Sequence, residues 1–215
     1  MFMKYKHIIW DWNGTLLNDT AECASVVDKL MVKNNLGNLT IEKYRQETCF
    51  PVINFYKALG FDFDKISFHD LAHEYIEQYE SLVESSNLQP ESLNCLNYLT
   101  EKGYTHSVLS AYEQKRLEFA VEHFGLTKYF QKIIGLSDLF ARSKVENGKK
   151  WIQELKYKPS EVIFIGDTTH DHEVAEAMGV DCILMTTGHQ SPEYFAETGR
   201  KTFDSLAEVQ QWLIN

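Results

Sequence analysis

The sequence predicts an α/β protein with a Rossmann-like core of five parallel strands, into which a helical domain is inserted. Three observations carry this prediction. Short apolar runs alternate with helical patterns, which is typical of a doubly wound parallel sheet. The runs are continuously apolar, as expected of strands that are buried on both faces. Between the first and second runs, about residues 17–103 contain only helical patterns, and this stretch is far longer than a single crossover.

The five apolar runs are too short for helices and are rich in β-branched or aromatic residues, so we expect them to be strands. They are 7–11, 106–110, 132–136, 162–167 and 182–187. Helical patterns separate the last four runs. Two of these patterns, "EQKRLEFAVEHFG" and "DHEVAEAMG", end on a glycine, which is a common stop signal for a helix.

The insertion is predicted to be helical and to leave the core directly after the first strand. "TAECASVVDKLMVKNN" is amphipathic, "PVINFYKALG" runs from a proline to a glycine, and "SFHDLAHEYIEQYESLVESS" opens like a capping box. We therefore expect a core domain at 1–17 and 86–215 and a helical cap domain at 18–85. Ligands of an open α/β sheet bind beyond the carboxyl ends of its strands, so a cap in this place can cover such a site.

Composition and charge restrict the classes of function. With 44% hydrophobic and 24% charged residues, the 215-residue chain resembles an ordinary globular protein. Its formal net charge of −10 and the lack of a dense Lys/Arg cluster argue against a nucleic-acid partner. No run approaches the ~20 apolar residues of a membrane span, and the N-terminal segment makes a poor signal peptide. The four cysteines form no C-x-x-C pair, so we expect a cytoplasmic protein with reduced thiols. No sequence feature bears on its oligomeric state.

Three aspartates are placed to meet at the edge of the predicted sheet. Asp11 ends the first run, and the Gly-Thr pair nearby leaves its carboxylate in an exposed turn. A carboxylate can attack phosphorus, and the competing interpretation is a helix cap. Asp167 and Asp171, in "GDTTHD", can face one cavity and offer the oxygen ligands that Mg²⁺ prefers. The capping interpretation fits Asp171 better than Asp167, and both uses can coexist.

Phosphate-binding groups are expected on two further segments. Ser110 ends the second run, where its hydroxyl and the amides of Ala111 and Tyr112 can hold a phosphate oxygen, or where the serine simply caps a helix. A lysine should neutralise the charge on a transferred phosphoryl group. Lys144, in the loop after the third strand, is favoured over Lys149, which is predicted in the first turn of a helix where lysines are commonly solvated.

Four other side chains carry weaker expectations. His170 either faces the site or, as is more common, is a solvent-facing turn residue, and His189 is expected to form part of the rim of the site. Neither has a partner at metal-ligand spacing. Trp12 is expected either to line the cavity or to lie in the core. In the cap, "RQETCFPV" is the stretch expected to face the substrate. Its Arg45 either reaches an anionic group or is a solvated helix residue.

The order of these motifs resembles that of the haloacid dehalogenase-like (HAD) hydrolase superfamily. "DWNGT", the strand that ends in Ser110, "SKVENGKK" and "GDTTHD" match its four motifs in order, and the insertion resembles the C1 cap of the phosphoglycolate-phosphatase-like branch. The resemblance extends from Asp11 to about Leu184. One motif alone is weak, but four in order at suitable strand ends are highly specific. One departure is that valine, not the familiar proline, follows Lys144.

The resemblance implies a Mg²⁺-dependent phosphatase that acts on a small phosphorylated metabolite through an aspartyl-phosphate. It implies that Asp11 is the nucleophile and that Asp11, Asn13 and Lys144 form the catalytic set. The implied metal ligands are Asp11, the backbone carbonyl of Asn13, Asp167 and Asp171, the last through water or a neighbouring group. The implied substrate-binding residues are Thr15, Ser110, Ala111 and Lys144.

Asn13 departs from the phosphatase pattern. Phosphatase members of the superfamily carry an aspartate two residues after the nucleophile, which protonates the leaving alcohol and then activates water. The amide of Asn13 can do neither at neutral pH. General acid–base catalysis contributes about 10²–10⁴-fold, so we expect slow turnover and accumulation of the aspartyl-phosphate.

Two other functions stay open. A HAD fold that has lost its acid/base group could bind a phosphorylated metabolite or a protein partner with little turnover. The phosphonatase branch also lacks this aspartate and uses a lysine of the cap as a Schiff base. No cap lysine of this sequence stands out for that role. The dehalogenase branch is disfavoured because it works without metal, whereas "GDTTHD" is an acidic motif.

Overall fold

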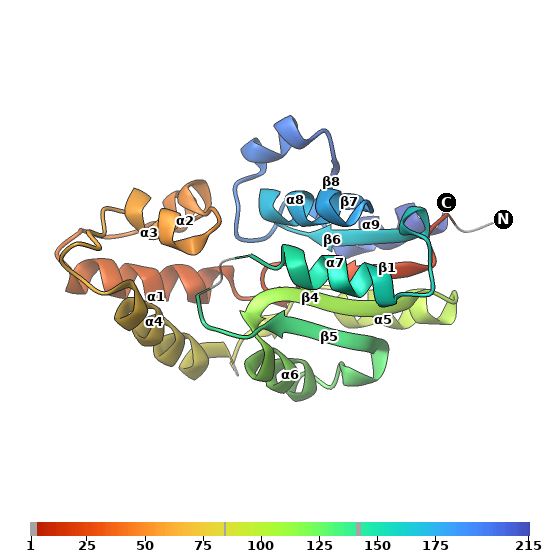
Figure 1. The fold of residues 1–215 in the computed structure, drawn as a ribbon, viewed down its shortest axis with the longest axis horizontal. Helices are drawn as coiled ribbons and strands as arrows, with labels where there is room; N and C mark the ends of the chain where they lie inside the picture. Colours follow the sequence, from red (N-terminus) through yellow and green to blue (C-terminus); the bar gives the residue numbers. More distant parts are fainter. Residues whose placement is uncertain (1–3, 84, 141–142) are drawn as a thin grey trace.

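The computed structural model describes residues 4–83, 85–140 and 143–215, and its centre is a parallel sheet (Figure 1). The strand order is β5-β4-β1-β6-β7-β8, and each neighbouring pair is parallel. The strands are β1 His7–Trp10, β4 Thr105–Glu113, β5 Phe130–Leu136, β6 Val162–Gly166, β7 Asp181–Met185 and β8 Lys201–Phe203. The predicted α/β fold with a parallel central sheet is confirmed.

The predicted number of five strands was wrong, because β8 adds a sixth strand at the edge of the sheet. Its sequence, "KTF", has two exposed residues and one half-buried residue, so it shows no apolar run. It is a strand because it pairs with β7, with Ile183 opposite Lys201 and Met185 opposite Phe203. A pairing of this kind is a tertiary effect that hydrophobic periodicity does not report.

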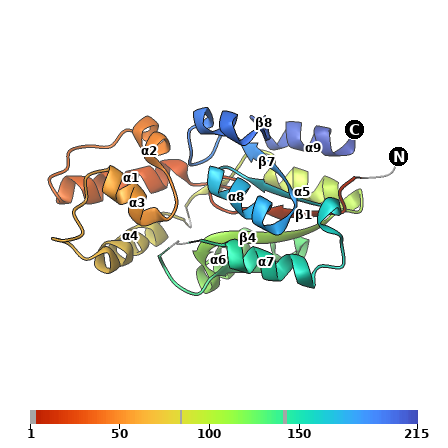
Figure 2. The ribbon, with the colours of Figure 1, turned by 45° about the horizontal axis from the view of Figure 1, so that its top comes forward.

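Helices cover both faces of the sheet (Figures 1 and 2). They are α5 Ser92–Glu101, α6 Gln114–His123, α7 Val145–Glu154, α8 Thr169–Met178 and α9 Leu206–Ile214. Alternate residues of β1 point to opposite faces: Ile8 and Trp10 join the buried cluster that includes α5, α6 and α9, and Ile9 joins the one with α7 and α8. The glycines predicted to stop α6 and α8, Gly125 and Gly179, both have positive φ. Three short 3₁₀ turns, Thr127–Tyr129, Pro159–Glu161 and Pro192–Thr198, complete the core.

The inserted segment forms four helices beyond the carboxyl ends of the strands (Figure 1). They are α1 Thr20–Lys33, α2 Ile41–Glu47, α3 Val52–Ala58 and α4 Phe68–Val83. The two crossings between these helices and the core pair with each other as a short antiparallel ribbon, β2 Leu17–Asn18 with β3 Asn87–Leu88. The predicted boundaries at 17/18 and 85/86 fall in or beside this ribbon, and the two-domain division stays a prediction.

None of the helices in the described part of the chain combines the length and the apolar character that crossing a bilayer requires.

Candidate active site

The carboxyl ends of three neighbouring strands, β4, β1 and β6, bring the predicted motifs together. Asp11 follows β1 and Asp167 follows β6, and the amide of Asp11 donates to the carbonyl of Ile165 at 2.8 Å, which aligns the two strand ends. Ser110 lies inside β4 and not at its end, because β4 continues to Glu113 after a register shift against β5. The predicted strand therefore ended too early, although Ser110 still lines the same cavity as Asp11.

Lys144 is the buried cation of this strand edge. Its Nζ lies 2.5 Å from Oδ1 of Asp11 and 2.7 Å from Oδ1 of Asp171, and it donates to the carbonyl of Leu109 at 3.0 Å. Lys149, the competing candidate, is partly exposed and pairs with Glu146, one helical turn away. The structure therefore places Lys144, and not Lys149, against the carboxylates.

Asp171 has two functions in the fold, one for each carboxylate oxygen. Oδ2 accepts hydrogen bonds from the amides of Asp167 and Thr168 at 3.0 and 2.9 Å and from the Thr168 hydroxyl at 2.8 Å. Thr168 in turn accepts from the amide of Asp171, which completes a capping box at the start of α8. Oδ1 is left to pair with Lys144. Asp171 therefore caps α8 with one oxygen and faces the buried cluster with the other, and its use as a metal ligand stays a prediction.

Asp167 is held by two loops that approach it very closely. The Thr15 hydroxyl donates to Oδ1 at 3.0 Å, and the amide of His189 donates to Oδ2 at 2.6 Å. A Cβ on Gly14, whose φ is +73°, or on Gly188 would lie 2.3 or 2.1 Å from Oδ2, so only glycine fits at either position. Thr15 is fully buried and touches Asp167. Its expected role in binding substrate stays a prediction.

Burial sets the electrostatics of this cluster. Burial raises the pKa of Asp11 well above its usual range, against the opposing charge of Lys144. Burial likewise raises the pKa of Asp167 to about 6. Burial opposes the charge on Asp171 too, but Lys144 beside it holds the pKa of this carboxyl below its usual value. Three buried carboxylates against one lysine leave an excess of negative charge, which a divalent cation would offset.

The donor set fits a hard cation. Asp11, Asp167 and Asp171 each present a carboxylate oxygen, and these atoms lie within 4.8 Å of one another. Oxygen ligands of this kind suit Mg²⁺, Ca²⁺ or Mn²⁺ better than softer metals. The acidic residues that the sequence assigned to metal binding are therefore brought together.

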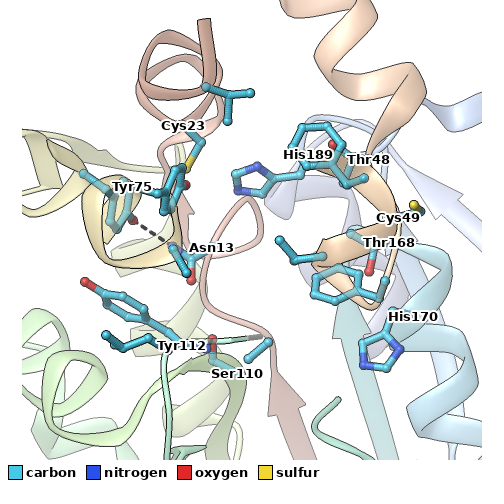
Figure 3. Close-up of a pocket in the computed structure, with 18 of the residues that line it drawn as sticks. Asn13, Cys23, Thr48, Cys49, Tyr75, Ser110, Tyr112, Thr168, His170 and His189 are labelled. Carbon is cyan, nitrogen blue, oxygen red and sulfur yellow. Dashed lines mark hydrogen bonds between the residues drawn. The ribbon is translucent and has the colours of Figure 1, made fainter. Parts of the chain in front are cut away.

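A cavity of about 170 Å³ lies between these strand ends and the inserted helices, and Figure 3 shows it from within. Asn13, Ser110 and Tyr112 lie on one side of it, and His189 and Thr168 lie across from them (Figure 3).

The amide of Asn13 is engaged in a buried hydrogen-bond network. Its Nδ2 donates to Oδ2 of Asp19 at 2.7 Å and to the Tyr79 hydroxyl at 2.8 Å, and Tyr79 donates to the same Asp19 oxygen at 2.6 Å. Oδ1 of Asp19 accepts from the amide of Gly14 at 2.9 Å and lies 3.2 Å from Nε2 of His189. The network thus ties the turn after β1 to α4 and to the loop after β7.

The architecture and the four motifs at the strand ends are matched by one known family. The family model described as "Haloacid dehalogenase-like hydrolase" matches residues 8–185. The chain belongs to this family. The expectation drawn from the motifs is thereby confirmed.

Two relatives and one solved structure show what this HAD chain is similar to. A phosphoglycolate phosphatase of Rhodobacter capsulatus is 24% identical, over 85% of each chain. The pyrophosphatase PpaX of Bacillus cereus (strain Q1) is 23% identical, over 79% of this chain and 77% of the relative. A crystal structure of a predicted phosphatase from Clostridium acetobutylicum superposes with a TM-score of 0.79 at 20% identity, over 98% of both chains, which shows the shared fold. The chain is thus similar in sequence to a phosphoglycolate phosphatase and a pyrophosphatase and shares its fold with the solved structure.

The cap arginine of this HAD chain fastens the cap to the core. Nη2 of Arg45 donates to the carbonyls of Thr186 and Gln190 at 2.5 and 3.3 Å, and the Gln190 side chain donates to the carbonyl of Thr48 at 3.0 Å. The charged group of Arg45 therefore binds backbone carbonyls of the core. The stretch "RQETCFPV" still reaches the cavity through Thr48 and the residues that follow it.

The fold decides between the alternatives that the sequence left open for His170 and Trp12. The solvent-facing interpretation of His170 was wrong, and the site-facing alternative agrees with the structure, since His170 lines the cavity. It is 6% exposed in the first turn of α8, and its ring stacks on Phe50 of the cap at 4.7 Å between centroids. Trp12 is fully buried in the hydrophobic core, which agrees with the core alternative.

Sequence reasoning missed Asp19 and Tyr79 as members of the HAD site. Asp19 is the N-cap residue of α1 by position, yet it makes no side-chain capping bond there. The only local signal was an acidic residue with no other evident use, six positions after Asn13. Tyr79 is one of several apolar-face residues of α4, and its hydrogen bond arises only from how that helix packs.

The buried pair of His189 and Asp19 makes a pH-dependent contribution to stability. Burial opposes both charges, but each group favours the other, so the pKa of His189 is raised to about 9 and that of Asp19 is lowered to about 2. A raised histidine pKa stabilises the fold fully below its unfolded value of about 6.5, and this is lost as the pH rises through 9. The lowered pKa of Asp19 stabilises the fold at pH values above about 4, and this contribution is lost as the pH falls towards 2.

We therefore expect His189→Gln to lower the free energy of unfolding by about 3 kcal/mol, and we expect this loss to be largest between pH 4 and 6.5. The difference in Tm from the unsubstituted protein should shrink steadily from pH 6.5 to 9.5, in buffers with EDTA. His73→Gln, at an exposed cap histidine, is the control and should show a small difference at every pH. A His189→Gln difference that does not change across this range would contradict the ion pair.

Proposed function

We propose that this HAD chain is a Mg²⁺-dependent phosphatase of a small phosphorylated metabolite, with a core at 1–17 and 86–215 and a cap at 18–85. The observation that carries the proposal is the buried cluster of Asp11, Lys144 and Asp171 beside the cavity, with Lys144 within 2.7 Å of both carboxylates. The names of the two relatives support it, since both act on phosphate-containing substrates.

In the first half of the proposed reaction, a carboxylate oxygen of Asp11 attacks phosphorus as the bond from phosphorus to the leaving oxygen breaks. Lys144, the Ser110 hydroxyl and the amide of Ala111 would hold the equatorial oxygens of the phosphoryl group. A Mg²⁺ ion on Asp11, Asp167 and the Asn13 carbonyl, with Asp171 beside it, would neutralise charge on the phosphoryl oxygens. The leaving oxygen takes its proton from water, because the amide of Asn13 is not acidic enough to protonate it.

In the second half, water attacks the phosphorus of the aspartyl-phosphate, releases phosphate and regenerates Asp11. The water must lose a proton, and the Asn13 amide cannot accept it. Nδ2 of Asn13 is also fixed by two hydrogen bonds, to Asp19 and Tyr79. Hydrolysis of the intermediate should therefore be the slow step, and substrates with good leaving groups should suffer least in the first step.

One alternative keeps an observation in its favour. The hydrogen bonds that hold Nδ2 of Asn13 are also compatible with a protein that binds a phosphorylated metabolite without turnover, since such a protein needs no acid/base group at this position. The phosphonatase alternative needs a lysine of the cap beside the substrate. Among the described residues that line the cavity, the only lysine is Lys144, which belongs to the core and not to the cap.

The proposal is tested by mixing the protein with acetyl phosphate and Mg²⁺ and quenching on the millisecond-to-second scale. We expect phosphate release that EDTA abolishes, and a peptide carrying one phosphoryl group on Asp11 in the quenched samples. No adduct on Asp11 and no phosphate release from acetyl phosphate or aryl phosphates would overturn it in favour of the binding protein.

A further inference from the structure

We propose that the substrate is a phosphate monoester whose organic part is uncharged and aromatic or otherwise apolar, in contrast to phosphoglycolate, which carries a second anionic group. This inference rests on the proposed phosphatase function and names the substrate class for the same cavity. It is drawn from the chemistry of the cavity wall opposite the catalytic cluster.

The cap supplies an uncharged wall to this cavity. Every described cap residue that lines it is neutral, and most carry an aromatic ring or an aliphatic chain. The rings and chains come from all four inserted helices and the α2–α3 loop, and they include Val27, Tyr44, Phe50, Phe55, Tyr56 and Ile76. A ring or an alkyl chain placed against such a wall is removed from water, which favours binding.

The tyrosines of this wall do not supply charge. Burial raises the pKa of Tyr44, Tyr56 and Tyr75 well above the usual phenol value, so their hydroxyls stay neutral donors at physiological pH. One further polar group is available, because His170 lines the cavity and its Nε2 has no hydrogen-bond partner among the described residues. The wall can therefore accept an uncharged polar atom on the ligand.

Among the residues that the structure describes, a second anion on the ligand would find no free counter-charge. Lys144 is the only lysine or arginine among the described residues that line the cavity. It is paired with Asp11 and Asp171 next to the phosphoryl position. Arg45 points its charge at core carbonyls, as described above.

Two other charged described residues outside the cluster line the cavity. His189 is already paired with Asp19, with Nε2 at 3.2 Å from Oδ1, and Glu113 would repel an anion. Burying a carboxylate without a partner is strongly unfavourable.

The test compares three phosphate monoesters of primary alcohols, namely benzyl phosphate, 4-carboxybenzyl phosphate and phosphoglycolate, each with Mg²⁺. The two benzyl esters have almost the same leaving group and differ by one carboxylate. We expect kcat/KM for benzyl phosphate to exceed that for each of the two anionic esters by tenfold or more. Equal or higher kcat/KM for either anionic ester would overturn the inference.

A matched pair of variants reports on the wall itself. Cys49 lies in the α2–α3 loop, lines the cavity and is partly exposed, so it can accept a longer side chain. Cys49→Lys should shift the ratio of kcat/KM towards 4-carboxybenzyl phosphate by tenfold or more, and Cys49→Met, of similar length and no charge, should leave it unchanged. The same shift in both variants, or none in either, would contradict the charge argument.

Binding separates this inference from the proposed function. Benzylphosphonate and 4-carboxybenzylphosphonate cannot be hydrolysed, and calorimetry with Mg²⁺ measures their affinities directly. Tenfold tighter binding of benzylphosphonate supports the inference even if no ester is turned over, in which case only the phosphatase proposal fails. Equal affinities, tighter binding of the carboxylated ligand, or binding of neither ligand would overturn the inference.

Discussion

An Asp11→Asn variant is expected to release phosphate at least about 10⁴-fold more slowly than the unsubstituted protein, because the amide cannot form the aspartyl-phosphate. The variant should remain folded. Asp11 is 8% exposed, and burial raises its pKa, so the carboxylate is an unfavourable buried charge in the absence of Mg²⁺. We expect its Tm in EDTA to equal or exceed that of the unsubstituted protein. The measurements are steady-state phosphate release and mass analysis of quenched samples.

Asp64→Asn is the matched control, since Asp64 is an exposed carboxylate of the cap. It should leave both the rate and the phosphoryl adduct unchanged. Phosphate release by Asp11→Asn at the unsubstituted rate would mean that Asp11 is not the nucleophile, and the activity would then have to come from another group or from a contaminant.

Exchanging the side chains at positions 13 and 19 should have the second large effect. Asn13→Asp alone puts a carboxylate where Nδ2 now lies 2.7 Å from Oδ2 of Asp19. Two carboxylates this close cannot both ionise easily, so the gain in rate should be small and the Tm should fall. Adding Asp19→Asn restores a donor opposite the introduced carboxylate. The double variant should hydrolyse the aspartyl-phosphate about 10²–10⁴-fold faster.

The decay of the phosphoryl adduct after a pulse of acetyl phosphate measures this step directly. Asp19→Asn alone is the control, because it makes the same change at position 19 without adding a base at position 13. Its adduct should decay no faster than that of the unsubstituted protein. If the double variant also decays at the unsubstituted rate, loss of the acid/base group at position 13 does not limit turnover. The binding-protein alternative would gain support if, in addition, Asp11→Asn changes nothing.

The sequence predicted the core well where the signal is local. The five apolar runs are strands because their buried side chains need a sheet, and the glycines after α6 and α8 have the positive φ that ends these helices. It failed at β8, whose three residues become a strand only through pairing with β7. It also ended β4 at Ser110, because the bulged continuation of this strand to Glu113 depends on β5.

The sequence by itself determined which residues meet at the catalytic edge. Asp11, Ser110 and Asp167 each follow or end an apolar run, and parallel strands bring such positions together at one edge. Only the tertiary structure decided how these groups are used. It turned one oxygen of Asp171 to the start of α8 and the other to Lys144. It joined Asn13 to Asp19, a partner that no local pattern indicates.

The chemistry of the cap wall was also decided by the tertiary structure. The rings and aliphatic chains of the inserted helices look in sequence like any buried helix face. The position of the cap over the strand ends turns part of that face into the lining of a cavity. Hydrophobic periodicity indicates that a side chain is buried away from water. It does not record whether the neighbour that replaces the water is another side chain or a substrate.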